Sequence, residues 1–164
     1  MKKITLTIFL FAFAIISYSQ DQTTFILVRH AEKADDGTRN PPLNEMGKER
    51  ANYLSDLLSR QEIDGLYSTP FKRTMETLQP IADQQGLEIK NYDPFAKGEW
   101  LQTIVEKHGN GTVIISGHSN TIPALANALL GEEKFEQWDE SDYSNLIIIV
   151  ATEVGNGKLV RLKF

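Results

Sequence analysis

Two short runs of residues in this sequence are almost entirely apolar, and they constrain the fold more than any other feature. They are residues 25–28 (Phe-Ile-Leu-Val) and residues 112–115 (Thr-Val-Ile-Ile). A strand with one face in water alternates apolar and polar residues, so these continuous runs predict strands that are buried on both faces. Strands of that kind occur almost only in parallel sheets covered by helices. The chain is therefore expected to adopt an α/β fold.

The rest of the chain alternates strand-like and helix-like patterns. Further strands are expected at residues 63–67, 87–92, 146–150 and 158–164. Asn156-Gly157 predicts a tight turn before the last of them. This order of elements predicts a three-layer α-β-α sandwich, in which a mostly parallel sheet has an antiparallel edge.

Helices are expected between these strands. Asn44 is a suitable N-cap for the first helix, and Thr69 is expected to cap the second, with Pro70 at its first position. A third helix is expected near residues 100–109 and a fourth near residues 122–130. Gly86 and Gly131 are expected to end the second and fourth helices, because glycine readily adopts the left-handed conformation that follows a helix.

Composition narrows the functional classes. The chain has 164 residues with 41% hydrophobic and 24% charged residues, which is typical of one globular domain. It has no cysteine, which excludes a disulfide scaffold, a cysteine nucleophile and a zinc site built from thiolates. With 17 basic and 22 acidic residues the net charge is −5, which argues against a broad surface for nucleic acid. A small cationic pocket is still compatible with this balance.

The N-terminal segment has the features of a secretory signal peptide. Lys2 and Lys3 precede a thirteen-residue apolar run at 4–16, and Ser17 and Ser19 place small residues before a cleavage site at Gln20. As a helix the run would span about 20 Å, less than the roughly 30 Å hydrocarbon core of a membrane. We expect a signal peptide at 1–19, a folded domain at 20–164, and a periplasmic or secreted protein without a membrane span after cleavage. The alternative is an uncleaved membrane anchor.

Four basic or titratable residues follow strands of the predicted sheet. Arg29 and His30 come directly after the first strand, Arg73 lies in the first turn of the helix after the second strand, and His118 follows the fourth strand. Ligands of open α/β sheets bind at the carboxyl ends of the strands, so we expect these side chains to converge. Arginine binds phosphate through two parallel hydrogen bonds, and a neutral imidazole can act as a nucleophile. The set therefore predicts a phosphate pocket.

Four segments resemble, in order, the motifs of the histidine phosphatase superfamily, which includes the phosphoglycerate mutases. Residues 29–32 (Arg-His-Ala-Glu) resemble its Arg-His-Gly signature, although Ala31 replaces the glycine. Residues 43–47 and 67–74 are similar to its Leu-(Thr/Ser)-x-x-Gly and Ser-x-x-x-Arg-(Ala/Thr) segments, and residues 117–120 resemble its Gly-His-(Gly/Ser) signature. The resemblance implies a phosphoglycerate mutase-like fold.

The resemblance also implies roles for single residues. His30 would be the nucleophile and would carry a transient phosphohistidine, while Arg29, Arg73 and His118 would bind the phosphoryl oxygens. No metal and no cofactor is implied. The substrate would be a phosphorylated small molecule, glycan or protein.

The proton donor is the open point of this assignment. Asp93, soon after the third strand, is the preferred candidate, and Glu99 and Glu32 are the alternatives, either as the acid or as residues that support the site. The aspartate that follows the second histidine in the acid-phosphatase branch is replaced by Ser119, so that route is closed.

Three functional interpretations follow. The preferred one is a metal-independent phosphatase that hydrolyses a phosphomonoester through a phosphohistidine on His30. The second is a phosphoglycerate mutase-like phosphoryl transferase, which the short segment between residues 74 and 112 disfavours. The third is a non-catalytic module that binds a phosphorylated ligand.

Overall fold

The computed structural model describes residues 21–96 and 98–164. The predicted signal peptide at 1–19 lies outside these residues, and it stays a prediction. Within the described ranges, no helix combines the length and the apolar character needed to cross a membrane.

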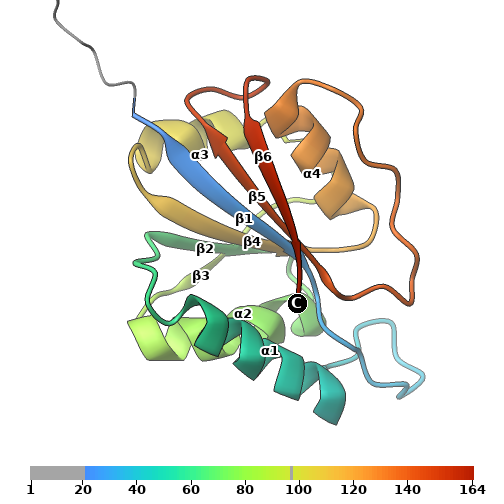
Figure 1. Cartoon of the computed structure of the whole chain (residues 1–164). Coiled ribbons are helices and arrows are strands. Elements are labelled where there is room, and N and C mark those ends of the chain that lie inside the picture. The colour runs from blue at the N-terminus through green and yellow to red at the C-terminus, as the bar shows by residue number, and fades with distance from the viewer. Residues whose placement is uncertain (1–20, 97) are drawn as a thin grey trace, which may run out of the picture.

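One six-stranded sheet organises the chain (Figure 1). Its strands are β1 (Thr23–Arg29), β2 (Gly65–Ser68), β3 (Ile89–Asn91), β4 (Thr112–Gly117), β5 (Asn145–Ala151) and β6 (Lys158–Lys163). They lie side by side in the order β3-β2-β4-β1-β5-β6. The pairs β3-β2, β2-β4 and β4-β1 are parallel, and the pairs β1-β5 and β5-β6 are antiparallel. The predicted parallel sheet with an antiparallel edge is confirmed.

Four helices cover the two faces of this sheet. Helices α1 (Glu45–Leu58) and α2 (Lys72–Gln85) lie on one face, and α3 (Leu101–Lys107) and α4 (Thr121–Leu130) lie on the other (Figure 1). The result is the expected three-layer α-β-α sandwich.

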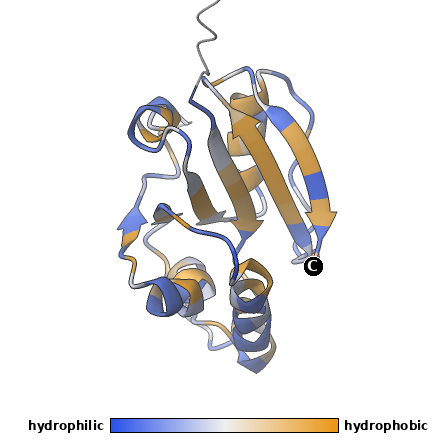
Figure 2. Ribbon diagram, turned by 60° about the vertical axis from the view of Figure 1, so that its left-hand side comes forward, coloured by the Kyte–Doolittle hydropathy of each residue, from blue (hydrophilic) through white to orange (hydrophobic). Residues whose placement is uncertain are grey.

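The residues of β1 explain why its apolar run is continuous. Phe25 and Leu27 belong to the core cluster under α3 and α4, whereas Ile26 and Val28 belong to the cluster under α1 and α2. Successive side chains of a strand point to opposite faces, so a strand with helices on both sides needs apolar residues at every position. Figure 2 shows the hydrophobic residues concentrated on the central strands.

The two predicted N-caps have different outcomes. The Asn44 side chain accepts a hydrogen bond from the Gly47 backbone N–H at 2.8 Å, so the first cap is confirmed. The prediction for α2 is wrong, because the helix begins at Lys72 and its N-cap residue, Phe71, makes no side-chain capping bond. The Phe71 N–H donates to the Thr69 carbonyl at 2.8 Å, and this turn delays the helix by two residues.

Strand β3 is shorter than its predicted range. It covers only Ile89–Asn91 of the expected 87–92, because it lies at the sheet edge and pairs with β2 alone. The remaining strands match their predicted ranges to within two residues at each end.

A pair of helix-ending glycines generates a stability prediction. Gly86 and Gly131 both adopt left-handed backbone conformations, with φ of 66° and 73°, after α2 and α4. A Cβ on Gly86 would meet nothing within 4 Å, whereas a Cβ on Gly131 would collide with the Gly155 carbonyl oxygen. Gly86→Ala should lower the free energy of unfolding by about 1 kcal/mol, the usual cost of this conformation for alanine.

Gly131→Ala should lower the free energy of unfolding further, by at least about 1 kcal/mol beyond the Gly86→Ala loss, because the collision forces the chain near Gly155 to move. Urea denaturation of the two variants measures the difference. Equal losses would show that the contact between Gly131 and Gly155 does not constrain the native chain.

Candidate active site

Pairing between β1 and β4 brings the two predicted site histidines together. Arg29 lies opposite Gly117 in the parallel register, and the His30 N–H donates to the Gly117 carbonyl at 2.9 Å just beyond the strands. His30 and His118 therefore leave neighbouring strands at the same level of the sheet. Their ring centroids are 5.5 Å apart, with the rings inclined at 69°.

The environment of His30 fixes its tautomer and its charge. Its Nδ1 lies 2.7 Å from the Ala31 carbonyl oxygen, which can only accept, so Nδ1 carries the proton and Nε2 keeps a lone pair. The side chain is buried, with 4% of its surface exposed. Burial, together with the positive charges of Arg29 and Arg73, lowers the pKa of His30 to about 3. The ring is therefore neutral at physiological pH.

His118 is half-buried and is held from two sides. Its Nε2 lies 3.0 Å from the Thr69 hydroxyl, and its Nδ1 lies 3.4 Å from an Nη2 of Arg73 that can only donate. Burial, together with the charges of Arg73 and Arg29, lowers the pKa of His118 to about 4. Thr69, predicted as a helix cap, thus orients the second histidine instead.

Thr77, one helical turn after Arg73, links Arg73 to the end of β1 by hydrogen bonds. The Thr77 hydroxyl donates to the Arg73 carbonyl at 2.7 Å and accepts from the Ala31 N–H at 2.9 Å. The buried Nε of Arg73 has no hydrogen-bond partner among the described residues. The buried Nε of Arg29 is unpartnered in the same way.

Arg29 is fully buried and holds a loop. Its Nη1 donates to the carbonyl oxygens of Asp139, Glu140 and Asp142 at 3.0, 2.9 and 3.1 Å. Its Nη2 forms an ion pair with the Glu140 carboxylate at 2.6 Å. Most of its donors are thus engaged by residues 139–142, and Arg29 does not line the cavity described next. Its role as a direct phosphate ligand stays a prediction.

A cavity of about 320 Å³ opens beside the two histidines. Its lining includes the predicted residues His30, Arg73 and His118, together with Lys33, Ser119, Asn120, Gln137 and Glu140. Sequence reasoning assigned no role at the site to these last five. Three of them could have been inferred from their closeness in sequence to the predicted histidines. Lys33 lies three residues after His30, and Ser119 and Asn120 follow His118 directly. Gln137 and Glu140 carry no such signal, since they come from the loop between α4 and β5.

None of the three predicted proton donors lines this cavity. Asp93 is exposed and accepts from the Phe95 N–H at 2.8 Å, and it lines a different cavity beside α3. Glu99 is exposed in the segment before α3. Glu32 is paired with Arg50, whose Nη2 donates to it at 2.7 Å. The assignment of an acid among them stays a prediction that the geometry does not favour.

The pairing between Glu32 and Arg50 gives Glu32 a structural environment. Burial raises the pKa of Glu32, but the hydrogen bonds from Arg50 outweigh it, so that the pKa ends below its ordinary value. A carboxylate held in its ionised form is a poor proton donor. Glu32 thus fits better as a residue that anchors α1 to the end of β1 than as an acid.

Glu140 is the carboxylate that lines the cavity with His30. One oxygen pairs with Arg29, and the other accepts a short hydrogen bond from the Ser119 hydroxyl. Its side chain is 67% exposed at the rim. A carboxylate in this place can accept a proton from a water molecule in the cavity.

The cavity therefore combines a neutral imidazole with cationic side chains. Arg73 and Lys33 supply positive charge, and the N-terminus of α4 begins beside His118. In the described residues, no group of three or more His, Asp or Glu side chains is arranged to hold a metal ion. This arrangement is chemically suited to binding a phosphoryl group next to Nε2 of His30.

Comparisons with known proteins agree with this chemistry. The model of the histidine phosphatase superfamily (branch 1) matches residues 25–96, a range that includes His30 and Arg73. Phosphoserine phosphatase 1 of Hydrogenobacter thermophilus is 28% identical over 176 residues, which cover 73% of this chain and 83% of the relative.

Solved structures show the same fold at lower identity. The protein histidine phosphatase SixA, complexed with tungstate, superposes with a TM-score of 0.70 at 19% identity, covering 85% of this chain and 96% of SixA. A phosphoserine phosphatase of Entamoeba histolytica in complex with phosphoserine superposes with a TM-score of 0.67 at 14% identity, covering 84% and 95%. The predicted phosphoglycerate mutase-like fold is confirmed. The chain is thus similar in sequence to the histidine phosphatase superfamily over residues 25–96, and similar in fold to these solved phosphatases.

Proposed function

We propose that this protein is a phosphatase that hydrolyses a phosphomonoester through a phosphohistidine intermediate on His30. The observation that carries the proposal is the state of His30, whose Nδ1–H is held by the Ala31 carbonyl and whose pKa is lowered to about 3 by burial and by nearby cations. A neutral imidazole with a free Nε2 lone pair is the form that can attack phosphorus.

The first chemical step transfers the phosphoryl group to His30. Nε2 forms a bond to phosphorus while the bond from phosphorus to the leaving-group oxygen breaks, and that oxygen keeps the electron pair and takes up a proton from water. Arg73 and Lys33 line the same cavity as His30 and can neutralise the phosphoryl oxygens. This step requires positioning and charge stabilisation more than covalent chemistry from other residues.

The second step releases phosphate. A water oxygen bonds to phosphorus, the N–P bond breaks, and Nε2 recovers its lone pair. The water must lose a proton as it attacks. Glu140 lies on the rim of the cavity as a carboxylate, so we assign it the role of accepting that proton.

A second candidate function differs from the first in the leaving group of its substrate. The only carboxylate that lines the described cavity is Glu140, which is paired with Arg29. A site without a proton donor suits leaving groups that need none, as in a phosphoryl group bound to one nitrogen of an imidazole ring whose other nitrogen carries a proton. A phosphohistidine on a protein is such a substrate, and the similarity in fold to SixA is consistent with it. The substrate is then a protein rather than a small phosphomonoester.

The covalent intermediate can be tested by trapping. After acid-free denaturation, protein mixed with ³²P-labelled phosphomonoester should carry label that is stable to base and labile to acid. His30→Ala should abolish the label, because it removes the attacking nitrogen. His108→Gln is the matched control, since His108 is a buried histidine outside the cavity. Label that persists in His30→Ala would refute His30 as the nucleophile.

The neutral state of His30 predicts a pH dependence of stability. The unfolded chain takes up a proton on this residue below pH 6.5, whereas the folded chain does so only near pH 3, so folding stability falls as the pH decreases between these values. From pH 7 to pH 5, the wild type should lose about 2 kcal/mol more of unfolding free energy than His30→Gln. Urea denaturation at the two pH values gives this difference. Parallel losses would mean that His30 is not held neutral by the fold.

The proton-transfer residues can be separated by comparing an alkyl phosphate with nitrophenyl phosphate. Glu140→Gln should slow turnover of both substrates by about 10²-fold and increase the trapped phosphoenzyme, because it removes the base of the second step. Asp93→Asn and Glu99→Gln should leave the ratio of the two rates unchanged, since neither residue lines the cavity. A selective loss of about 10²-fold or more on the alkyl phosphate in either variant would instead identify that residue as the acid.

A further inference from the structure

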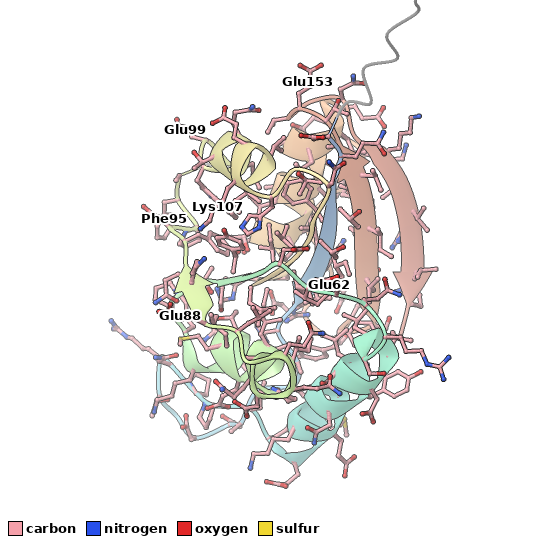
Figure 3. The ribbon with its side chains drawn as sticks, turned by 90° about the vertical axis from the view of Figure 1, so that its left-hand side faces the viewer. Glu62, Glu88, Phe95, Glu99, Lys107 and Glu153 are labelled. Atoms are coloured by element: carbon pink, nitrogen blue, oxygen red, sulfur yellow. The ribbon has the colours of Figure 1, made fainter. Side chains whose placement is uncertain are left out.

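A second cavity lies along the free edge of the sheet, between β3 and α3. Its volume is about 460 Å³, which is within the range of small-molecule sites, and it shares no lining residue with the cavity around His30. The reaction proposed above does not use it. Figure 3 looks onto this side of the molecule, where Lys107 and Phe95 lie near the cavity.

Aromatic rings form the floor of this cavity. Trp100 stacks on Tyr92, with ring centroids 4.4 Å apart and planes inclined at 26°, and its ring lies 6.1 Å from that of Tyr67. Both tyrosine hydroxyls are engaged elsewhere, with His108 Nε2 at 2.8 Å from Tyr67 and with the Ser116 carbonyl at 3.2 Å from Tyr92. The tyrosines therefore contribute apolar ring surface rather than polar groups.

Two lysines border this aromatic floor. Lys90 comes from β3, and its Nζ lies 6.0 Å from the centroid of the Tyr67 ring, while Lys107 comes from the last turn of α3. Both line the cavity, and neither forms a salt bridge with any carboxylate in the described ranges 21–96 and 98–164. The neighbouring Lys90 ammonium lowers the pKa of Lys107, as expected for two like charges in contact.

One acidic residue also lines the cavity. Asp93 lies in the segment that leads to α3, and its carboxylate accepts the Phe95 N–H at 2.8 Å. His108 is bonded to Tyr67 of the floor, and burial lowers its pKa first while the charges of Lys107 and Lys90 lower it further. Two lysines and one aspartate line the cavity, so it has an excess of positive charge beside its aromatic surface.

We propose that this cavity is a binding site for a small organic anion with a flat apolar ring. The ring would lie against Trp100, and its acidic group would accept hydrogen bonds from Lys90 and Lys107. Binding an anion there removes the repulsion between the two ammonium groups, so the ligand gains from both charges at once. Apolar contact with the aromatic floor adds affinity that a simple inorganic anion would lack.

Nuclear magnetic resonance of the two tryptophan indoles tests this site directly. The chain has two tryptophans, Trp100 in the cavity and Trp138 in the loop after α4, so their indole N–H signals report on different places. The probe is 2-naphthoate, titrated into the ¹⁵N-labelled full chain, with assignment by Trp138→Phe. It should shift the Trp100 signal with half-saturation below about 1 mM and leave the Trp138 signal unchanged.

Charge and location are tested separately. Lys90→Gln and Lys107→Gln should each weaken binding by about tenfold, because each removes a charge-assisted hydrogen bond. Lys158→Gln, on the opposite edge strand β6, and His30→Ala, in the other cavity, should bind like the wild type. The amine 2-naphthylmethylamine, which carries a positive group on the same ring, should not shift Trp100.

Several results would overturn the proposal. One is the absence of a saturable shift of Trp100. Equal shifts of both tryptophans would indicate non-specific association. Unchanged affinity in both lysine variants, or equal binding of the amine, would mean that the ring and not the charge determines binding.

Discussion

The parallel pairing of β1 with β4 is the constraint on which the candidate site depends. It sets His30 and His118 at the same level on adjacent strands, and the bond from the His30 N–H to the Gly117 carbonyl continues that pairing past the strand ends. A register shift of one residue would move each side chain of β1 to the other face of the sheet. The cores on both faces fix the register, because Phe25 and Leu27 fill one and Ile26 and Val28 fill the other. Apolar packing far from the chemistry thus determines where the histidines meet.

The candidate site also depends on the loop between α4 and β5. In the first half of the loop, the Asn127 side chain accepts a hydrogen bond from the Phe135 N–H at 2.9 Å. In the second half, Arg29 donates to three backbone carbonyl oxygens. Arg29 is buried at the end of β1, and the loop supplies acceptors for both of its Nη groups, whereas its buried Nε has no partner among the described residues. The same contacts place Glu140 on the rim of the cavity. Arg29 therefore shapes the site through the loop that it binds.

The sequence was sufficient to predict the parts of this molecule that rest on local patterns. Continuous apolar runs predicted the buried strands, and strand ends predicted where His30, Arg73 and His118 would meet, because the geometry of parallel sheets fixes these positions. The start of α2 was missed, since the turn at Thr69–Phe71 depends on hydrogen bonds that no propensity describes. Glu140 was missed for a stronger reason. Its position results from an ion pair with Arg29, 111 residues away in the chain, and no periodicity encodes such a contact.

Gly117 shows how packing on one face of the sheet reaches the motif around His118. A Cβ at this position would lie 2.7 Å from the Tyr92 hydroxyl and 2.7 Å from the Thr121 hydroxyl, closer than real contacts allow. Glycine is therefore needed here because the Tyr92 and Thr121 hydroxyls lie so close to the backbone, and not because the backbone conformation is unusual. The Thr121 hydroxyl accepts the His118 N–H at 2.9 Å, which fixes the backbone of the second histidine. Tyr92 in turn stacks on Trp100, so one tyrosine packs both under the backbone that carries His118 and into the floor of the edge cavity.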